Sequence, residues 1–178
     1  MRIFIALEFS GEFLESLLNS VLSLKEKYPG VRWIPKENLH ITMAFLGDTD
    51  PALLPRVFEA AGFASGFPAI HAKCGKIFTL PRSNPNVLAA GFDIGGDRMA
   101  VLAKTLGENL EKNGIIFDKK HGSFLPHITL ARSKTGLKKE NTPLIPAEGD
   151  IIRMTVFESR LAAQGAVYSA LSSVPLKV

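Results

Sequence analysis

The sequence predicts an α+β protein with mostly antiparallel strands and with helices on the outer faces of the sheets. Strand and helix patterns follow one another as β, α, β, α, then β, β, α, β, then β, β, and this order does not fit a doubly wound parallel sheet. Two near-identical stretches, His40-Ile41-Thr42 and His127-Ile128-Thr129, each lie near a helix pattern. We therefore expect a single domain, residues 1–178, built of two similar lobes that share a cleft.

Each element is assigned from its hydrophobic period and from the turn residues at its ends. Ser10 and Asp97 are expected to cap helices, and Pro51 to occupy the first turn of another. The expected strands are residues 3–7, a motif strand from Asn38, 69–78, 87–92, 115–117, a second motif strand, 150–159 and 167–176. The expected helices run from Ser10 to before Tyr28, over 52–64, and from Asp97 to Asn113. An extended piece is expected at 32–35, and loops at 81–86, 119–122 and 134–141.

Composition excludes some classes of protein. The net charge of +4 is mild and is compatible with a phosphorylated or polyanionic substrate. Cys74 is the only cysteine, which excludes an intramolecular disulfide and a cysteine-based metal cluster and favours a buried apolar role. No apolar run is long enough to span a bilayer. Glu8 interrupts the first apolar run and no signal cleavage site follows, so we expect a cytoplasmic protein.

The repeated motif is the strongest functional signal in the chain. Side chains alternate across a strand, so His40 and Thr42 share one face, as do His127 and Thr129. The opposite faces are apolar and suit a core. One such segment is more often a strand with a half-buried histidine, but two copies provide an acid, a base and two hydroxyl anchors for an anion.

These stretches resemble the 2H phosphoesterase superfamily, in its RNA 2′,3′-cyclic phosphodiesterase branch, also called the 2′-5′ RNA ligase family. The resemblance covers nearly the whole chain. The similar stretches are residues 1–7, 32–35, 37–40, 45–47, 124–132 and 158–159. The resemblance implies a bilobal fold with pseudo-twofold symmetry. It also implies RNA ends or nucleotides with a 2′,3′-cyclic phosphate as partners, and hydrolysis to a 2′-phosphate with a possible reverse ligation.

Opening a cyclic phosphodiester requires one proton to be removed from the attacking oxygen and one to be given to the leaving oxygen. Two histidines with pKa values near neutrality suit that task. Thr42 and Thr129 would donate hydrogen bonds to the non-bridging oxygens. The resemblance implies that His40 donates the proton and His127 accepts it, whereas the residues themselves are symmetric and leave the roles open.

Two further substrate-binding residues are expected. The resemblance implies that Arg132 contacts the phosphate, but simple alternation places it away from His127, so a strand end, twist or bulge must turn it inward. Simple alternation likewise places Phe45 on the face opposite His40, and we expect Phe45 to pack in the core. Tyr168 and Phe124 are candidates for stacking on a base or ribose, with core filling the better expectation for Phe124.

Other charged residues are expected to be structural or solvated. The family often carries a basic residue where this chain has Leu125. Histidines without a threonine partner, and the loop lysines that could steer RNA, are assigned no role in the reaction. These are His71, His121 and Lys119, Lys120, Lys134, Lys138 and Lys139.

No cofactor and no metal are expected, because no Asp, Glu or Cys lies beside either motif histidine at ligand spacing. Activity should therefore survive EDTA, and a monomer is expected. Two alternatives stay open. One is a 2H phosphoesterase of a small cyclic nucleotide or similar phosphodiester, and the other is a non-catalytic RNA-binding module.

Overall fold

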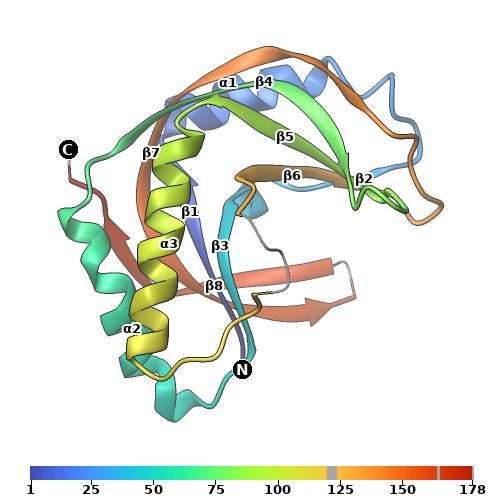
Figure 1. The fold of residues 1–178 in the computed structure, drawn as a ribbon. Coiled ribbons are helices and arrows are strands. Elements are labelled where there is room, and N and C mark those ends of the chain that lie inside the picture. Colours follow the sequence, from blue (N-terminus) through green and yellow to red (C-terminus); the bar gives the residue numbers. More distant parts are fainter. Residues whose placement is uncertain (120–123, 164, 178) are drawn as a thin grey trace.

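The computed structural model describes residues 1–119, 124–163 and 165–177. Eight strands form one continuous sheet in the order β2-β6-β5-β4-β7-β1-β3, with β8 paired to β7 (Figure 1). All of these pairings are antiparallel, which confirms the expected α+β class. The strands are β1 (Arg2–Phe9), β2 (Arg32–Trp33), β3 (Ile41–Asp48), β4 (Ile70–Leu80), β5 (Val87–Ile94), β6 (His127–Arg132), β7 (Asn141–Ala162) and β8 (Gly165–Pro175).

The long strand β7 runs through both halves of the sheet. From Asn141 to Ile151 it pairs with β4, and from Ile151 onward it pairs with β1 on its other edge. From Arg153 onward β8 takes the edge that β4 has left. We call β8, the C-terminal part of β7, β1 and β3 the first lobe, and β2, β6, β5, β4 and the N-terminal part of β7 the second lobe.

The two lobes share a local plan. The first contains β1, then α1 (Gly11–Leu22), then β3, and the second contains β5, then α3 (Gly96–Lys112), then β6. In each lobe the motif strand pairs with the strand that precedes the helix, β3 with β1 and β6 with β5. The expected arrangement of strand, helix and motif strand is therefore present twice.

Helices cover one side of the strands and bury a single apolar core. Figure 1 shows α3 beside α2 (Leu54–Gly62), both on one side of β1 and β3. The short turns η1 (Lys36–Asn38), η2 (Pro51–Leu53) and η3 (Phe63–Gly66) complete the elements. Ser10 caps α1 as expected, its side chain accepting a hydrogen bond from the backbone N–H of Phe13. Cys74 lies in the core, as its apolar role predicts.

Several local expectations are wrong. Residues 115–117 form no strand. Asp97 lies in the first turn of α3 and does not cap it, because the cap is Gly95 with a φ of 89°. The first motif strand begins at Ile41 and not at Asn38, because Asn38 is the last residue of η1 and residues 39–40 connect the two elements. β7 begins at Asn141, earlier than expected, and its prolines are accommodated because this part of β7 pairs on one edge only.

The remaining expectations concern the loops and the membrane. Residues 133–140 are irregular, in agreement with the expected loop. The loop expected at 119–122 lies largely outside the described residues, which end at 119 and resume at 124. Within the described part of the chain, no helix is long and apolar enough to cross a membrane.

The contact between α1 and β7 generates a prediction about stability. A Cβ atom on Gly149 would lie 2.7 Å from the Cβ of Phe13, a fully buried residue of α1. Gly149→Ala should therefore lower the free energy of unfolding by about 1–3 kcal/mol through overpacking. Urea unfolding followed by circular dichroism measures this change. Gly66→Ala is the control, because no atom lies within 4 Å of its added Cβ. Equal losses in the two variants would contradict the prediction.

Candidate active site

His40 directly precedes β3, and its ring is hydrogen-bonded to the backbone two residues earlier. The turn η1 and the residue after it lead into His40, and the ring Nδ1–H donates to the carbonyl of Asn38 over 2.7 Å. A carbonyl can only accept, so the proton of the neutral ring is on Nδ1 and Nε2 is an acceptor. Nε2 lies 3.0 Å from the Thr42 hydroxyl, which then donates to it. The histidine and threonine of the motif therefore lie together, as alternation predicts.

His127, the first residue of β6, makes the same Nδ1–H hydrogen bond. Its Nδ1–H donates to the carbonyl of Leu125 over 2.8 Å. In both motifs the acceptor is thus the carbonyl two residues before the histidine. The same bond fixes the same tautomer in each neutral ring, in which the Nε2 atom carries the lone pair.

A β-bulge follows the first threonine. Thr42 of β3 lies opposite Ala6 of β1, but the next paired residue is Ala44, opposite Ile5. Met43 is therefore an extra residue in β3, and the alternation of side chains shifts by one beyond it. As a result Phe45 lies on the face of Thr42 and is 56% exposed. The expected core role for Phe45 is wrong for this reason.

The second motif has a bulge at the equivalent place. Thr129 of β6 lies opposite Ala89 of β5, and the next paired residue is Ala131, which makes Leu130 the extra residue. The shift brings Arg132 to the face of Thr129 and leaves it exposed. The sequence analysis required a strand end, twist or bulge to place Arg132 on the face of His127, and a bulge is present.

The aromatic residues of the first lobe surround His40. The ring of Phe4 lies 5.1 Å from the imidazole between centroids, and the ring of Tyr168 lies 5.5 Å from it, edge-on. Phe4 in turn stacks on Phe157 at 5.2 Å. Asn38 ties β8 to this cluster, because its side-chain amide donates to the carbonyl of Ala166. Tyr168 is thus beside the candidate site, as the sequence analysis expected.

This environment changes the acidity of His40. Burial among the rings disfavours the charged imidazolium and lowers the pKa of His40 to about 4. The positive charges of His127 and Arg132 lower it as well, while the Asn38 carbonyl acts in the opposite direction. Those charges act on His40 from the second lobe. His40 therefore lies within electrostatic range of His127 and Arg132.

The chain segment that leads into His40 is hydrogen-bonded to the second lobe next to the site. β2 pairs with the end of β6, Arg32 opposite Arg132 and Trp33 opposite Ala131. The backbone N–H of Ile34 then donates to the carbonyl of Leu130 over 2.8 Å. The segment that leads into His40 is therefore bound to the strand that begins with His127. The sequence analysis expected an extended piece here but not its partner.

Two aromatic neighbours of the histidines were missed. Phe4 contacts His40, and the ring of Phe78 lies 6.3 Å from that of His127 at a steep angle. Each belongs to a strand pattern that reads as core. The available signal was alternation, because Phe4 shares its face with Glu8, a residue that does not suit a core.

The remaining residues that the sequence analysis considered are packed against the core, exposed or outside the described residues. Phe124 is partly buried and packs against the core. His71 is exposed on the outside of the second lobe, with its ring nitrogens 2.9 Å from Glu148 and 3.3 Å from Asp150. Lys119 forms an ion pair with Glu111. Lys120 and His121 lie outside the described residues. Among the residues described, no three His, Cys, Asp or Glu side chains are grouped as metal ligands.

Comparisons with known proteins find relatives in sequence and in fold. The family model described as LigT like Phosphoesterase matches residues 9–89. The RNA 2′,3′-cyclic phosphodiesterase of Archaeoglobus fulgidus is 30% identical over 165 residues, 89% of this chain and 83% of the relative. The protein of the same name from Thermotoga maritima is 28% identical over 178 residues, 96% of this chain and 93% of the relative. The chain belongs to the LigT-like phosphoesterase family.

Solved structures share the fold across the whole chain. The crystal structure of the protein TT0787 from Thermus thermophilus has a TM-score of 0.84 at 24% identity and covers 99% of this chain and 98% of its own. The apo form of Escherichia coli LigT has a TM-score of 0.79 at 21% identity, with the same coverage. At this identity the likeness concerns the fold.

The low pKa of His40 predicts acid sensitivity. The unfolded chain binds a proton at His40 below about pH 6.5, whereas the folded protein resists it down to about pH 4. Stability should therefore fall as the pH falls through this window. His40→Asn should reduce the loss between pH 7 and pH 4 by on the order of 1–3 kcal/mol. Urea unfolding of both proteins at each pH measures it, and equal losses would contradict the depressed pKa.

Proposed function

We propose that this protein hydrolyses the 2′,3′-cyclic phosphate ends of RNA and leaves a 2′-phosphate, with His40 and His127 as its acid and base. The single observation that carries the proposal is the duplicated geometry, in which the Nδ1–H of each motif histidine donates to the carbonyl two residues earlier, so that both neutral rings have the same tautomer. The names of the relatives from A. fulgidus and T. maritima support the substrate.

The phosphate would bind between the two motifs. In-line displacement places the attacking and leaving oxygens on opposite sides of phosphorus, which two histidines from two lobes can serve. Thr42 and Thr129 would donate hydrogen bonds to the non-bridging oxygens. The Thr42 hydroxyl would first give up its hydrogen bond to Nε2 of His40. Arg132 lies on the same face and its positive charge acts at His40, so it would balance the phosphate charge.

The proposed mechanism requires one protonated and one neutral histidine. With a pKa of about 4, His40 is neutral in the free protein near pH 7. For His40 to protonate the leaving O3′, the bound phosphate must raise that pKa, and an anion between His40 and Arg132 acts in this direction. The reverse assignment lets neutral His40 accept the proton of water while His127 protonates the leaving oxygen. The identity of the product distinguishes the two.

Tyr168 would contact the ribose or base of the substrate, since its ring already lies against His40. Ligation in the reverse direction would join ends through a 2′-5′ bond by the same proton transfers. A cytoplasmic location, a monomeric state and independence of metal ions stay predictions.

The proposed function is tested with purified protein, EDTA, and either RNA ending in a 2′,3′-cyclic phosphate or 2′,3′-cyclic AMP. We expect turnover of both and 2′-AMP as the main mononucleotide product, separated from 3′-AMP by chromatography. Predominant 3′-AMP would show that the cyclic phosphate binds in the opposite orientation, which is still compatible with the two-histidine mechanism. Activity that requires a divalent ion would contradict that mechanism.

The roles of the histidines are tested by substitution. His40→Ala and His127→Ala should each lower kcat at least ~100-fold, the usual scale of general acid or base catalysis. Thr42→Val and Thr129→Val should lower it less, because a remaining donor still holds the phosphate. His71→Ala is the matched control, since His71 is exposed outside the candidate site. Turnover at the wild-type rate in either motif variant would exclude the mechanism.

A further inference from the structure

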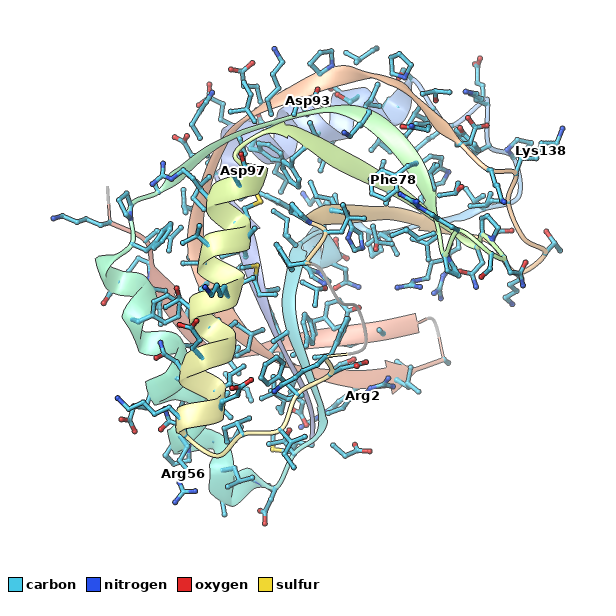
Figure 2. The ribbon with its side chains drawn as sticks, in the orientation of Figure 1. Arg2, Arg56, Phe78, Asp93, Asp97 and Lys138 are labelled. Atoms are coloured by element: carbon cyan, nitrogen blue, oxygen red, sulfur yellow. The ribbon has the colours of Figure 1, made fainter. Side chains whose placement is uncertain are left out.

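A cavity of about 220 Å³ lies beside the second motif. Phe78 of β4, Gly91 of β5 and Asp97 of α3 contribute to its wall, and so does the segment 124–126 that leads directly into His127. Figure 2 shows Asp97 at the beginning of α3. The proposed reaction assigns no role to this cavity.

The cavity is connected to the reacting groups through two shared elements. Phe78 belongs to its wall and also contacts the ring of His127 at 6.3 Å. Leu125 belongs to its wall and accepts the Nδ1–H bond of His127. A ligand in the cavity would thus lie next to a phosphate held by His127.

Gly91 allows two side chains to lie over the strand at this point. It sits between Lys76 of β4 and His127 of β6 in the sheet register. A Cβ on Gly91 would lie 2.8 Å from the ring of Phe78 and 3.0 Å from Cε of Lys76. The absence of that Cβ lets Phe78 and Lys76 cover the strand beside His127.

The chemistry of the wall fits a nucleobase. Phe78 and Phe124 offer aromatic surface on which a flat base can stack. The Asp97 carboxylate can accept hydrogen bonds from the N–H groups of adenine, guanine or cytosine. Lys76 adds a positive charge to the same wall. Aromatic, acidic and basic groups at one cavity match a nucleotide better than a purely apolar ligand.

We propose that this cavity is a base-recognition subsite, in which the base of the nucleotide carrying the cyclic phosphate stacks on Phe78 and is hydrogen-bonded by Asp97. The proposal rests on the proposed function, because it takes the cyclic phosphate to lie between His40 and His127. It implies that a five-membered cyclic phosphate without a base is a poor substrate.

The test compares kcat/KM for 2′,3′-cyclic AMP with kcat/KM for glycerol 1,2-cyclic phosphate, which keeps the reacting ring and lacks the base. Wild-type protein should prefer the nucleotide by at least ~10-fold, within the range that base stacking provides. Phe78→Leu and Asp97→Ala should each reduce this ratio about 10-fold. A merely structural role for Phe78 beside His127 would lower both values together and keep the ratio.

Asp93→Ala is the matched control. Asp93 carries the same charge on the neighbouring end of β5, but its carboxylate lies against Gly75 and does not line the cavity (Figure 2). The ratio should be unchanged in this variant. Equal kcat/KM for the two substrates in wild-type protein would overturn the subsite, and so would an unchanged ratio in both cavity variants. Hydrolysis of neither substrate would instead overturn the proposed function, and the subsite with it.

Discussion

Both lobes depend on the backbone hydrogen bonds of one strand. β7 pairs with β4 along its first part and with β1 along its second part, and the change takes place at Ile151. Because the strand continues through this point, the two halves of the sheet are parts of one hydrogen-bonded network. The positions of β3 and β6, and therefore of the two histidines, follow from it.

The sequence predicted the pairs of side chains in the motifs well, because alternation along a strand is a local property. His40 with Thr42 and His127 with Thr129 needed only the period of two. The faces beyond the threonines could not be predicted in the same way. Residues 41, 43 and 45 are all apolar and read as one buried face, whereas the bulge at Met43 divides them. A bulge arises from pairing with a strand distant in the sequence, so the motif itself carries no signal for it.

The fold class was predictable and its connections were not. The order of strand and helix patterns was enough to favour an antiparallel α+β fold. The pairing of β2 with β6 joins residues near 33 to residues near 131, and two residues of extended chain give no indication of such a partner. The aromatic surroundings of His40 are of the same kind, because Phe4, Phe157 and Tyr168 meet only through long-range pairing. The lowered pKa of His40 therefore depends on strand pairing across the sheet.

The bond between Ile34 and Leu130 has a consequence for how the protein takes up its substrate. It joins the segment before His40 to the strand that begins with His127, so the backbone segments that carry the two imidazoles are connected by a hydrogen bond. In the proposed mechanism, this bond would help to set the distance between His40 and His127 before a ligand binds. Less binding energy would then be needed to bring the two histidines together around the phosphate.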